Sequence, residues 1–167
     1  MKNILAFAAV LCLVATASFA GPKAGQWGVG VETFSYAGMG GDDTNVNMSY
    51  GLDDASAVRV SIGFDGGMGL AGDLKSGKVL GLGVEYRMYK ANSGKVSPFM
   101  AGSLDLSGDL DAFGDTMHAV VGGSIGGEYW YNDNISIDAS FGVAIDHQKD
   151  ATNLTFGTTG VGFNLYW

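Results

Sequence analysis

From residue 27 onward, apolar residues alternate with polar or small ones at a period of two. This is the pattern of β-strands with two different faces. After residue 20 no uninterrupted apolar stretch has the ~20 residues that a membrane-spanning helix needs. The alternation predicts eight strands, and the run 97–106 is the weakest, so the pattern leaves its phase open. The eight runs are 27–33, 45–52, 58–65, 80–88, 97–106, 117–131, 135–146 and 160–167.

Residues 1–20 have the pattern of a secretory signal peptide. A short basic start at Lys2 precedes an apolar run without charges, and Ser18 and Ala20 are small residues at the positions that a signal peptidase reads. The apolar run is too short for a bilayer-spanning helix, which is the alternative interpretation. We therefore expect a cleaved signal peptide at 1–20 and one β-barrel domain at 21–167.

The connections between the predicted strands alternate in length. The short ones, at 53–54, 91–95 and 132–134, are rich in Asp, Asn, Ser and Gly, which favour tight turns. The longer ones are 37–44, 66–77, 107–116 and 147–154. Strict alternation predicts a closed, antiparallel, up-and-down barrel of eight strands with its tight turns at one rim. Transmembrane barrels have this arrangement, with short periplasmic turns and longer extracellular loops.

Charged residues are sorted by type along the chain. Both arginines and all three glutamates lie within predicted strands on the face opposite the apolar one, whereas the lysines after residue 20 lie in the tail, loops, turns or strand ends. Arginine forks can bridge carboxylates in a confined interior. We therefore predict a charged cluster that fills the lumen, rather than an ordinary solvated sheet face. Its members are Glu32, Arg59, Glu85, Arg87, Glu128 and Asp138.

This placement of charges indicates that the apolar face points outward, into lipid. Aromatic residues on that face gather near the short-turn rim, where they predict an aromatic girdle at the periplasmic interface. The girdle comprises Trp27, Tyr50, Tyr86, Tyr129, Tyr131 and Trp167. The opposite assignment, with the apolar face inward around a ligand, would give a soluble lipocalin-like barrel.

The chain resembles the small outer-membrane β-barrels of the OmpA/OmpX type in Gram-negative bacteria, over the whole of 21–167. Its last residues resemble the terminal signal that the barrel-assembly machinery reads, with Trp at the end instead of the commoner Phe. The resemblance implies an outer-membrane location, contact with membrane lipid and lipopolysaccharide, and assembly by that machinery, but no peptidoglycan-binding domain. The signal residues are Gly162, Phe163, Leu165 and Trp167.

Other chemistries are poorly supported. A formal charge of −8 argues against nucleic-acid binding, and a single cysteine excludes a disulfide framework. Four carboxylates, Asp105, Asp109, Asp111 and Asp115, are weak candidates for Ca²⁺, but their spacing is not that of an EF-hand. We expect no cofactor and no structural metal.

The function expected from these features is non-enzymatic: a structural or surface-interaction role through the four longer loops. A narrow, gated ion conductance through the lumen is the first alternative. A lipid A-modifying enzyme is a weaker one, suggested by His118 near the predicted position of Asp146 and His147, because a His beside an Asp can act as a general base. The soluble lipocalin-like binder is the last. No sequence feature identifies a surface ligand.

Overall fold

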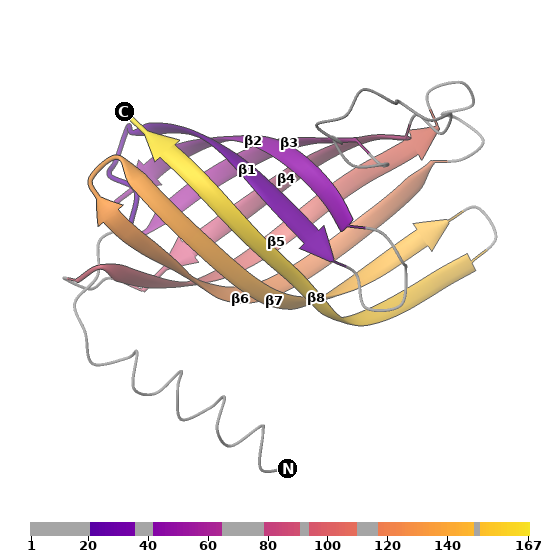
Figure 1. Cartoon of the computed structure of the whole chain (residues 1–167). Helices are drawn as coiled ribbons and strands as arrows, with labels where there is room; N and C mark the ends of the chain where they lie inside the picture. The colour runs from indigo at the N-terminus through magenta and orange to yellow at the C-terminus, as the bar shows by residue number, and fades with distance from the viewer. Residues whose placement is uncertain (1–20, 36–41, 65–78, 91–93, 110–116, 149–150) are drawn as a thin grey trace, which may run out of the picture.

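The protein is a closed barrel of eight antiparallel strands, each paired with the next (Figure 1). A computed structural model describes residues 21–35, 42–64, 79–90, 94–109, 117–148 and 151–167. Within these residues no helix is long and apolar enough to cross a membrane. The strands are β1 (Trp27–Ser35), β2 (Asp42–Asp53), β3 (Ser56–Phe64), β4 (Val79–Tyr89), β5 (Val96–Asp109), β6 (His118–Asn132), β7 (Ile135–Gln148) and β8 (Ala151–Tyr166).

The barrel closes by pairing of β1 with β8, the first strand with the last. Across this seam Trp27 and Trp167 exchange two backbone hydrogen bonds, at 3.2 and 2.9 Å. The ladder that starts at Trp27 runs through Tyr50, Val58, Tyr86, Gly102, Gly123 and Val143 to Phe156. Gly157 forms a bulge in the β7–β8 ladder and is not counted in the stagger. The stagger from Phe156 to Trp167 is then about ten residues, and a stagger of this size tilts the strands by roughly 40° from the barrel axis.

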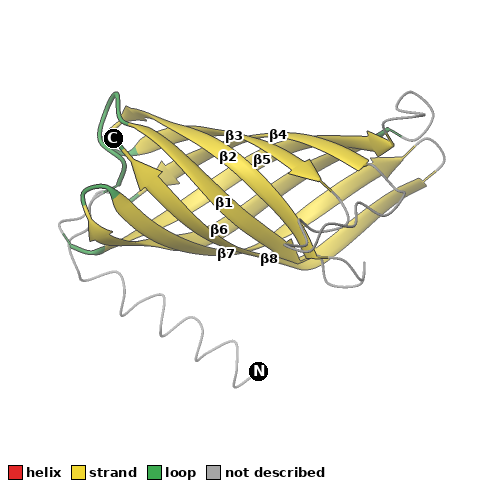
Figure 2. Cartoon of the chain, turned by 45° about the horizontal axis from the view of Figure 1, so that its top comes forward, coloured by secondary structure: helices red, strands yellow, loops and turns green. Residues whose placement is uncertain are grey.

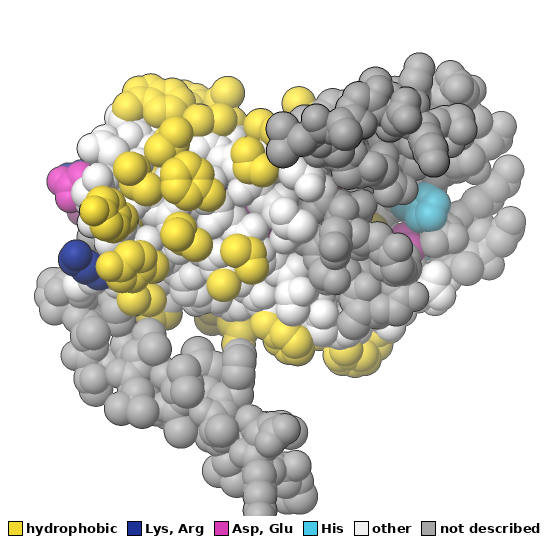
Figure 3. Space-filling model, in the orientation of Figure 1, with side chains coloured by type: hydrophobic (Ala, Val, Ile, Leu, Met, Phe, Trp, Pro, Cys, Tyr) yellow, Lys and Arg dark blue, Asp and Glu magenta, His cyan; other side chains and the backbone are white. Residues whose placement is uncertain are grey.

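Side chains alternate between lumen and exterior along every strand, as the period-two pattern predicts. On β7, for example, Ile137, Phe141 and Val143 are exposed, whereas Ser136 and Asp138 are buried inside. Figure 3 shows hydrophobic side chains spread over the visible wall of the barrel, while the visible Lys and Arg side chains lie at the short-turn end. The apolar face therefore points outward, and the charged residues of the strands point into the lumen.

Tight turns at one rim have the expected chemistry. Between β2 and β3, the Asp53 carboxylate accepts a hydrogen bond from the Ala55 amide at 2.8 Å. Between β6 and β7, the Asn132 side chain accepts one from the Asn134 amide at 2.9 Å. These side-chain bonds stabilise turns of two residues, with Asp54 and Ala55 in one and Asp133 and Asn134 in the other. Figure 2 shows these turns in green at one end of the barrel.

The structure corrects one prediction, about β7 and β8, and settles a point in β5 that the sequence left open. The expected loop at 147–154 is wrong, because β7 continues to Gln148 and β8 begins at Ala151, with Asp146 paired to Asn153 and Gln148 to Ala151. The region is polar on both faces, so it lacks the alternation by which a strand is recognised. The open phase of 97–106 is settled: Ser97, Phe99 and Ala101 are buried inside, and Met100 and Leu104 are exposed.

Candidate functional site

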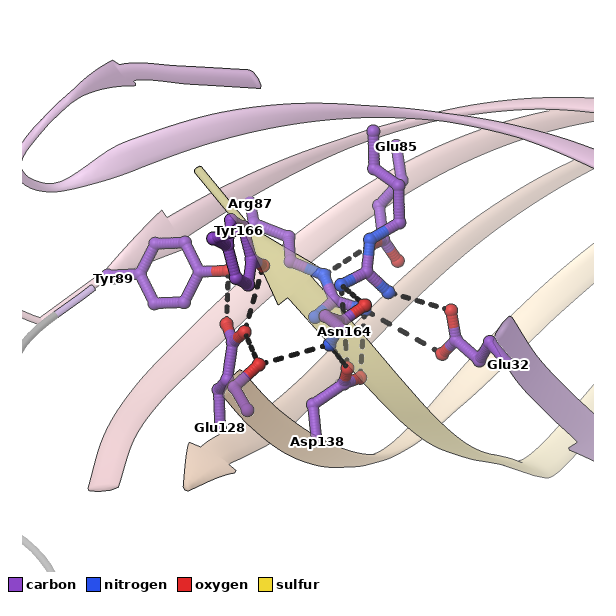
Figure 4. Close-up of polar contacts among 10 residues, drawn as sticks. Glu32, Glu85, Arg87, Tyr89, Glu128, Asp138, Asn164 and Tyr166 are labelled. Atoms are coloured by element: carbon purple, nitrogen blue, oxygen red, sulfur yellow. Dashed lines mark hydrogen bonds and ion pairs between the residues drawn. The ribbon is translucent and has the colours of Figure 1, made fainter. Parts of the chain in front are cut away.

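Charged side chains from four strands converge in the lumen (Figure 4). Arg59 on β3 and Arg87 on β4 are at most 3% exposed, and so are Glu32 on β1 and Asp138 on β7. Glu85, two residues before Arg87 on the same strand, is half-buried. The strand register places the charged residues of β3 and β4 side by side, because Arg59 is the direct partner of Glu85. We call these five residues the lumen cluster.

Two carboxylates of the lumen cluster each bridge both arginines. Glu32 lies 2.8 Å from Arg59 Nη1 through Oε2 and 3.6 Å from Arg87 Nη2 through Oε1. Asp138 lies 3.4 Å from Arg59 Nη2 through Oδ2 and 3.1 Å from Arg87 Nη2 through Oδ1. Glu85 adds an ion pair with Arg87 Nε. Buried charges are tolerated when they are paired in this way, and losing one partner leaves the others uncompensated.

Glu128 was predicted as part of this cluster, but its hydrogen-bond partners are hydroxyl groups. Tyr89 donates to Oε2 at 2.7 Å, and Tyr166 donates to Oε1 at 2.9 Å. The Ser136 hydroxyl also donates to Oε1. Glu128 is fully buried. Three hydroxyl donors therefore stabilise a carboxylate between the lumen cluster and the short-turn end, because hydrogen bonds to a charged group are stronger than those between neutral groups.

Asn164 joins the two groups of residues. Its amide nitrogen donates to Ser136 Oγ at 3.2 Å and to Asp138 Oδ2 at 2.7 Å. Its amide oxygen accepts from Arg59 Nη2 at 3.2 Å. The result is one continuous hydrogen-bonded network across the half of the lumen nearer the short-turn rim, which we call the lower lumen. In this network each polar group orients the next.

Aromatic rings close the network on its lower side. The Arg87 guanidinium lies 4.2 Å from the centroid of the Phe99 ring, and the Trp130 and Tyr166 rings lie 4.8 Å apart. Sequence reasoning missed six uncharged members of the network and of the aromatic layer because it followed charges alone. All six lie on the inward-facing positions of their strands, and this is the signal that could have found them. They are Tyr89, Phe99, Trp130, Ser136, Asn164 and Tyr166.

Inward-facing glycines provide the space that the long side chains occupy. A Cβ atom at Gly162 would lie 2.6 Å from Asp138 Oδ2, and one at Gly30 would lie 2.9 Å from Asn47 Oδ1. Real Cβ atoms do not approach other atoms so closely, so any larger residue would displace the network. The lumen at this level is filled by side chains, as in other small barrels.

Beyond the lumen cluster, toward the opposite rim, the lumen holds a cavity of about 60 Å³ with polar and apolar residues in its wall. Glu85 and Asp105 lie in its wall with Asn45, Ser103 and Ser124. A partly polar space of this size holds a few water molecules. The cavity ends at the lumen cluster, so the cluster separates it from the short-turn end.

The remaining predicted residues occupy the following places. The six aromatic residues of the expected girdle lie on the outer face near the short-turn rim, with the Trp27 and Tyr50 rings 4.7 Å apart. Phe163, Leu165 and Trp167 point outward, whereas Gly162 points inward against Asp138. Of the carboxylates considered for Ca²⁺, Asp105 lines the cavity, the Asp109 side chain is not described, and Asp111 and Asp115 lie outside the described residues.

Two further features bear on chemistry at the rim opposite the tight turns. His118 Nδ1 lies 3.5 Å from Asp146 Oδ1, while His147 points outward and shares a hydrogen bond of 2.9 Å with Thr152. Among the described residues, no three His, Cys, Asp or Glu side chains form a group that could hold a metal ion.

No protein-family model and no curated protein sequence matches the chain. Solved structures do match it. The N-terminal β-barrel domain of Pseudomonas aeruginosa OprF aligns with a TM-score of 0.60 at 16% identity, covering 85% of this chain and 98% of that domain. Neisserial surface protein A aligns with a TM-score of 0.55 at 14% identity, covering 85% and 95%. A de novo designed transmembrane β-barrel aligns with a TM-score of 0.57 at 14% identity, covering 87% and 98%. The chain therefore has the fold of small eight-stranded outer-membrane barrels.

Proposed function

We propose that this protein is a non-enzymatic β-barrel of the outer membrane of a Gram-negative bacterium. In this proposal residues 1–20 are a cleaved signal peptide, and the barrel-assembly machinery inserts the mature chain among lipid and lipopolysaccharide. Its role is structural, or an interaction at the cell surface through the connections at the rim opposite the tight turns. Because β7 and β8 extend to Gln148 and Ala151, that surface comprises three longer connections and the tip of the β7–β8 hairpin.

The outward apolar face is the observation that carries this proposal. Large apolar side chains on every strand are exposed, among them Val31, Met48, Val60 and Val84 at 45–54%. A soluble protein rarely exposes contiguous apolar surface of this extent. A closed barrel also satisfies every backbone hydrogen bond internally, which the hydrocarbon core of a membrane requires.

The filled lumen supports a structural or surface role. Arg59, Arg87 and their carboxylates occupy the lower lumen, and the cavity above them is small. A wide aqueous channel requires more strands than eight. The connections at the far rim are then the parts of the molecule that are free to meet a partner.

Membrane fractionation followed by gel electrophoresis tests the location and the face assignment. We expect the protein in the outer-membrane fraction, with a mobility that changes when the sample is boiled, because the internal backbone hydrogen bonds resist detergent until heated. Recovery from the soluble periplasmic fraction would overturn the proposal. Mass spectrometry of lipid A with and without the protein tests the non-enzymatic role, and an altered acylation pattern would contradict it.

A narrow, gated ion conductance is the second candidate. Glu85 belongs both to the wall of the cavity and to the lumen cluster, so rearrangement of the cluster would be needed to extend a path toward the short-turn end. Single-channel recording of the wild type and of Arg87→Ala distinguishes the candidates. Near-zero conductance in both favours the structural role, while a conductance that the substitution increases favours a gated path.

A further inference from the structure

The segment immediately before β1 lies at the short-turn mouth of the barrel, where it contacts the β2–β3 and β6–β7 turns. Pro22 is fully buried there. The backbone at Gly21 packs against the Tyr89 ring, because a Cβ atom at this position would lie 3.3 Å from Tyr89 Cγ. Tyr89 is the residue that donates to Glu128, so the segment lies directly below the network that fills the lumen.

This segment is attached to turns on both sides of the β1–β8 seam. On one side, the Ala24 amide donates to Asp54 Oδ1 at 3.4 Å in the β2–β3 turn. On the other, Lys23 Nζ lies 2.9 Å from Asp133 Oδ2, and the Gln26 side chain donates to the Asp133 carbonyl at 3.0 Å in the β6–β7 turn.

The segment packs closely against the backbone of Gly51 on β2. The Gly25 amide donates to the Gly51 carbonyl at 2.8 Å, and the Gly51 amide donates to the Gln26 carbonyl at 2.9 Å. A Cβ atom at Gly51 would collide with the Lys23 carbonyl oxygen. Gly25 has a φ of 78°, which favours glycine because other residues clash there. Two glycines therefore permit the close approach of the segment to the barrel.

We infer that residues 22–26 form a strap that seals the short-turn mouth against water and small solutes, and that the strap can leave without unfolding the strands. Its attachments are the two backbone hydrogen bonds to Gly51, the turn contacts, a buried proline and an ion pair whose side chains are 65% and 80% exposed. Exposed ion pairs contribute little to stability. The strands are held by continuous ladders instead, so the strap belongs to the parts of the fold that open locally first. The inference concerns the opposite end of the barrel from the proposed surface role and does not depend on that role.

A buried thiol reporter tests the strap. Ser49 lies two residues above Gly51 on the inner face of β2, is 3% exposed, and its hydroxyl has no hydrogen bond among the described residues. Cys12, the single native cysteine, lies in the proposed signal peptide, so Ser49→Cys gives the mature barrel one defined thiol. The probe is a small cationic methanethiosulfonate, applied to the folded barrel in detergent. Ser103→Cys, in the wall of the far cavity, is the accessible reference.

We expect Ser49→Cys to react slowly while the strap is intact. Gly51→Ala should raise its labelling rate by about tenfold or more, because the added Cβ displaces the Lys23 carbonyl and opens the mouth. The matched control is Gly102→Ala, where a Cβ atom meets nothing within 4 Å, and labelling should not change. Ser103→Cys should react at one rate in all these backgrounds.

A second variant, outside the strands, keeps the inference testable if Gly51→Ala fails to fold. Pro22→Asp places a charge at the buried anchor and should also release the strap while the boiling-dependent gel shift persists. Two results would overturn the inference: labelling of Ser49→Cys that is already as fast as that of Ser103→Cys, or labelling that stays slow in every folded strap variant.

Discussion

Arg87 stacks on Phe99, with 4.2 Å between the guanidinium carbon and the ring centroid, and both side chains are buried in the lumen. The ring therefore supports the arginine that joins Glu85, Asp138 and Glu32. A desolvated cation–π contact contributes about 2 kcal/mol. Phe99→Leu should lower the free energy of unfolding by at least that amount in urea titrations followed by tryptophan fluorescence.

Met100→Leu is the matched control for Phe99→Leu, because Met100 is the neighbouring side chain on the outer face and is 59% exposed. A swap of similar apolar residues there should change the unfolding free energy by no more than about 0.5 kcal/mol. Equal losses in the two variants would mean that stacking under Arg87 contributes nothing specific.

The losses of stability on removing a buried charge and on removing its partner should not be additive. Arg87→Met leaves Glu85 and Asp138 with less compensation and should destabilise the barrel by about 3–5 kcal/mol. Adding Asp138→Asn to Arg87→Met removes one uncompensated carboxylate, so the double variant should lose less than the sum of the single losses. A double-mutant cycle from urea titrations measures this coupling, and simple additivity would contradict the ion-pair network.

The hydroxyl groups around Glu128 should contribute more than their counterparts outside. Tyr89→Phe removes one hydrogen bond to a buried carboxylate and should lower the unfolding free energy by about 1.5–3 kcal/mol. Tyr86→Phe, three residues earlier on the outer face, should change it by less than about 0.5 kcal/mol. The same titration checks both variants, and a neutral Tyr89→Phe would argue against the hydroxyl network.

Charge tolerance should differ between the two faces of the barrel wall. Val84→Arg places a cation on the outer face and should cost about 2–4 kcal/mol if that face meets lipid. Ser103→Arg points inward, opposite Glu85 in the register and beside the cavity that Asp105 also lines, so it should be better tolerated. Refolding yield into lipid vesicles, scored by the boiling-dependent gel shift, compares them. The reverse order would refute the face assignment.

Two glycines in the strands should respond differently to alanine. Gly30→Ala puts a Cβ atom within contact distance of Asn164, Asn47 and the Phe163 carbonyl, and should destabilise the barrel by about 1–3 kcal/mol. Gly102→Ala meets open space on the outer face and should be neutral or stabilising by up to about 1 kcal/mol. Thermal gel-shift curves rank the two variants against the wild type.

Much of this architecture could be predicted from the sequence because the outer face of most strands follows a simple rule: its side chains are apolar. Wherever that rule applies, as from Ile135 to Ile145, alternation identifies a strand. The apolar outer face ends near the tip of the β7–β8 hairpin. There His147 and Thr152 are polar and exposed, although they are still partners in the β7–β8 strand register. Alternation also fails in β5, because Phe99 and Ala101 are apolar inward residues beside apolar outward ones.

The candidate site was only partly accessible to sequence reasoning. Parity along the strands placed Glu32, Arg59, Glu85, Arg87 and Asp138 on the inner face, where the structure groups them. Parity did not distinguish Glu128, which accepts hydrogen bonds from hydroxyl groups, because the partners of a side chain also depend on its height within a tilted barrel. The strap at 22–26 has no periodic pattern, and its position follows from contacts with distant turns.

The pairing of β1 with β8 has a consequence for the order of events during biogenesis. Among the strands, β1 emerges from the ribosome first and its partner across the seam emerges last, so one edge of β1 has no partner until β8 has been made. Loop closure over such a sequence separation is slow, and a waiting edge invites aggregation. A chain interrupted anywhere before β8 would keep two open edges. Closure of the barrel therefore has to wait for β8, and the open edge of β1 needs protection until then.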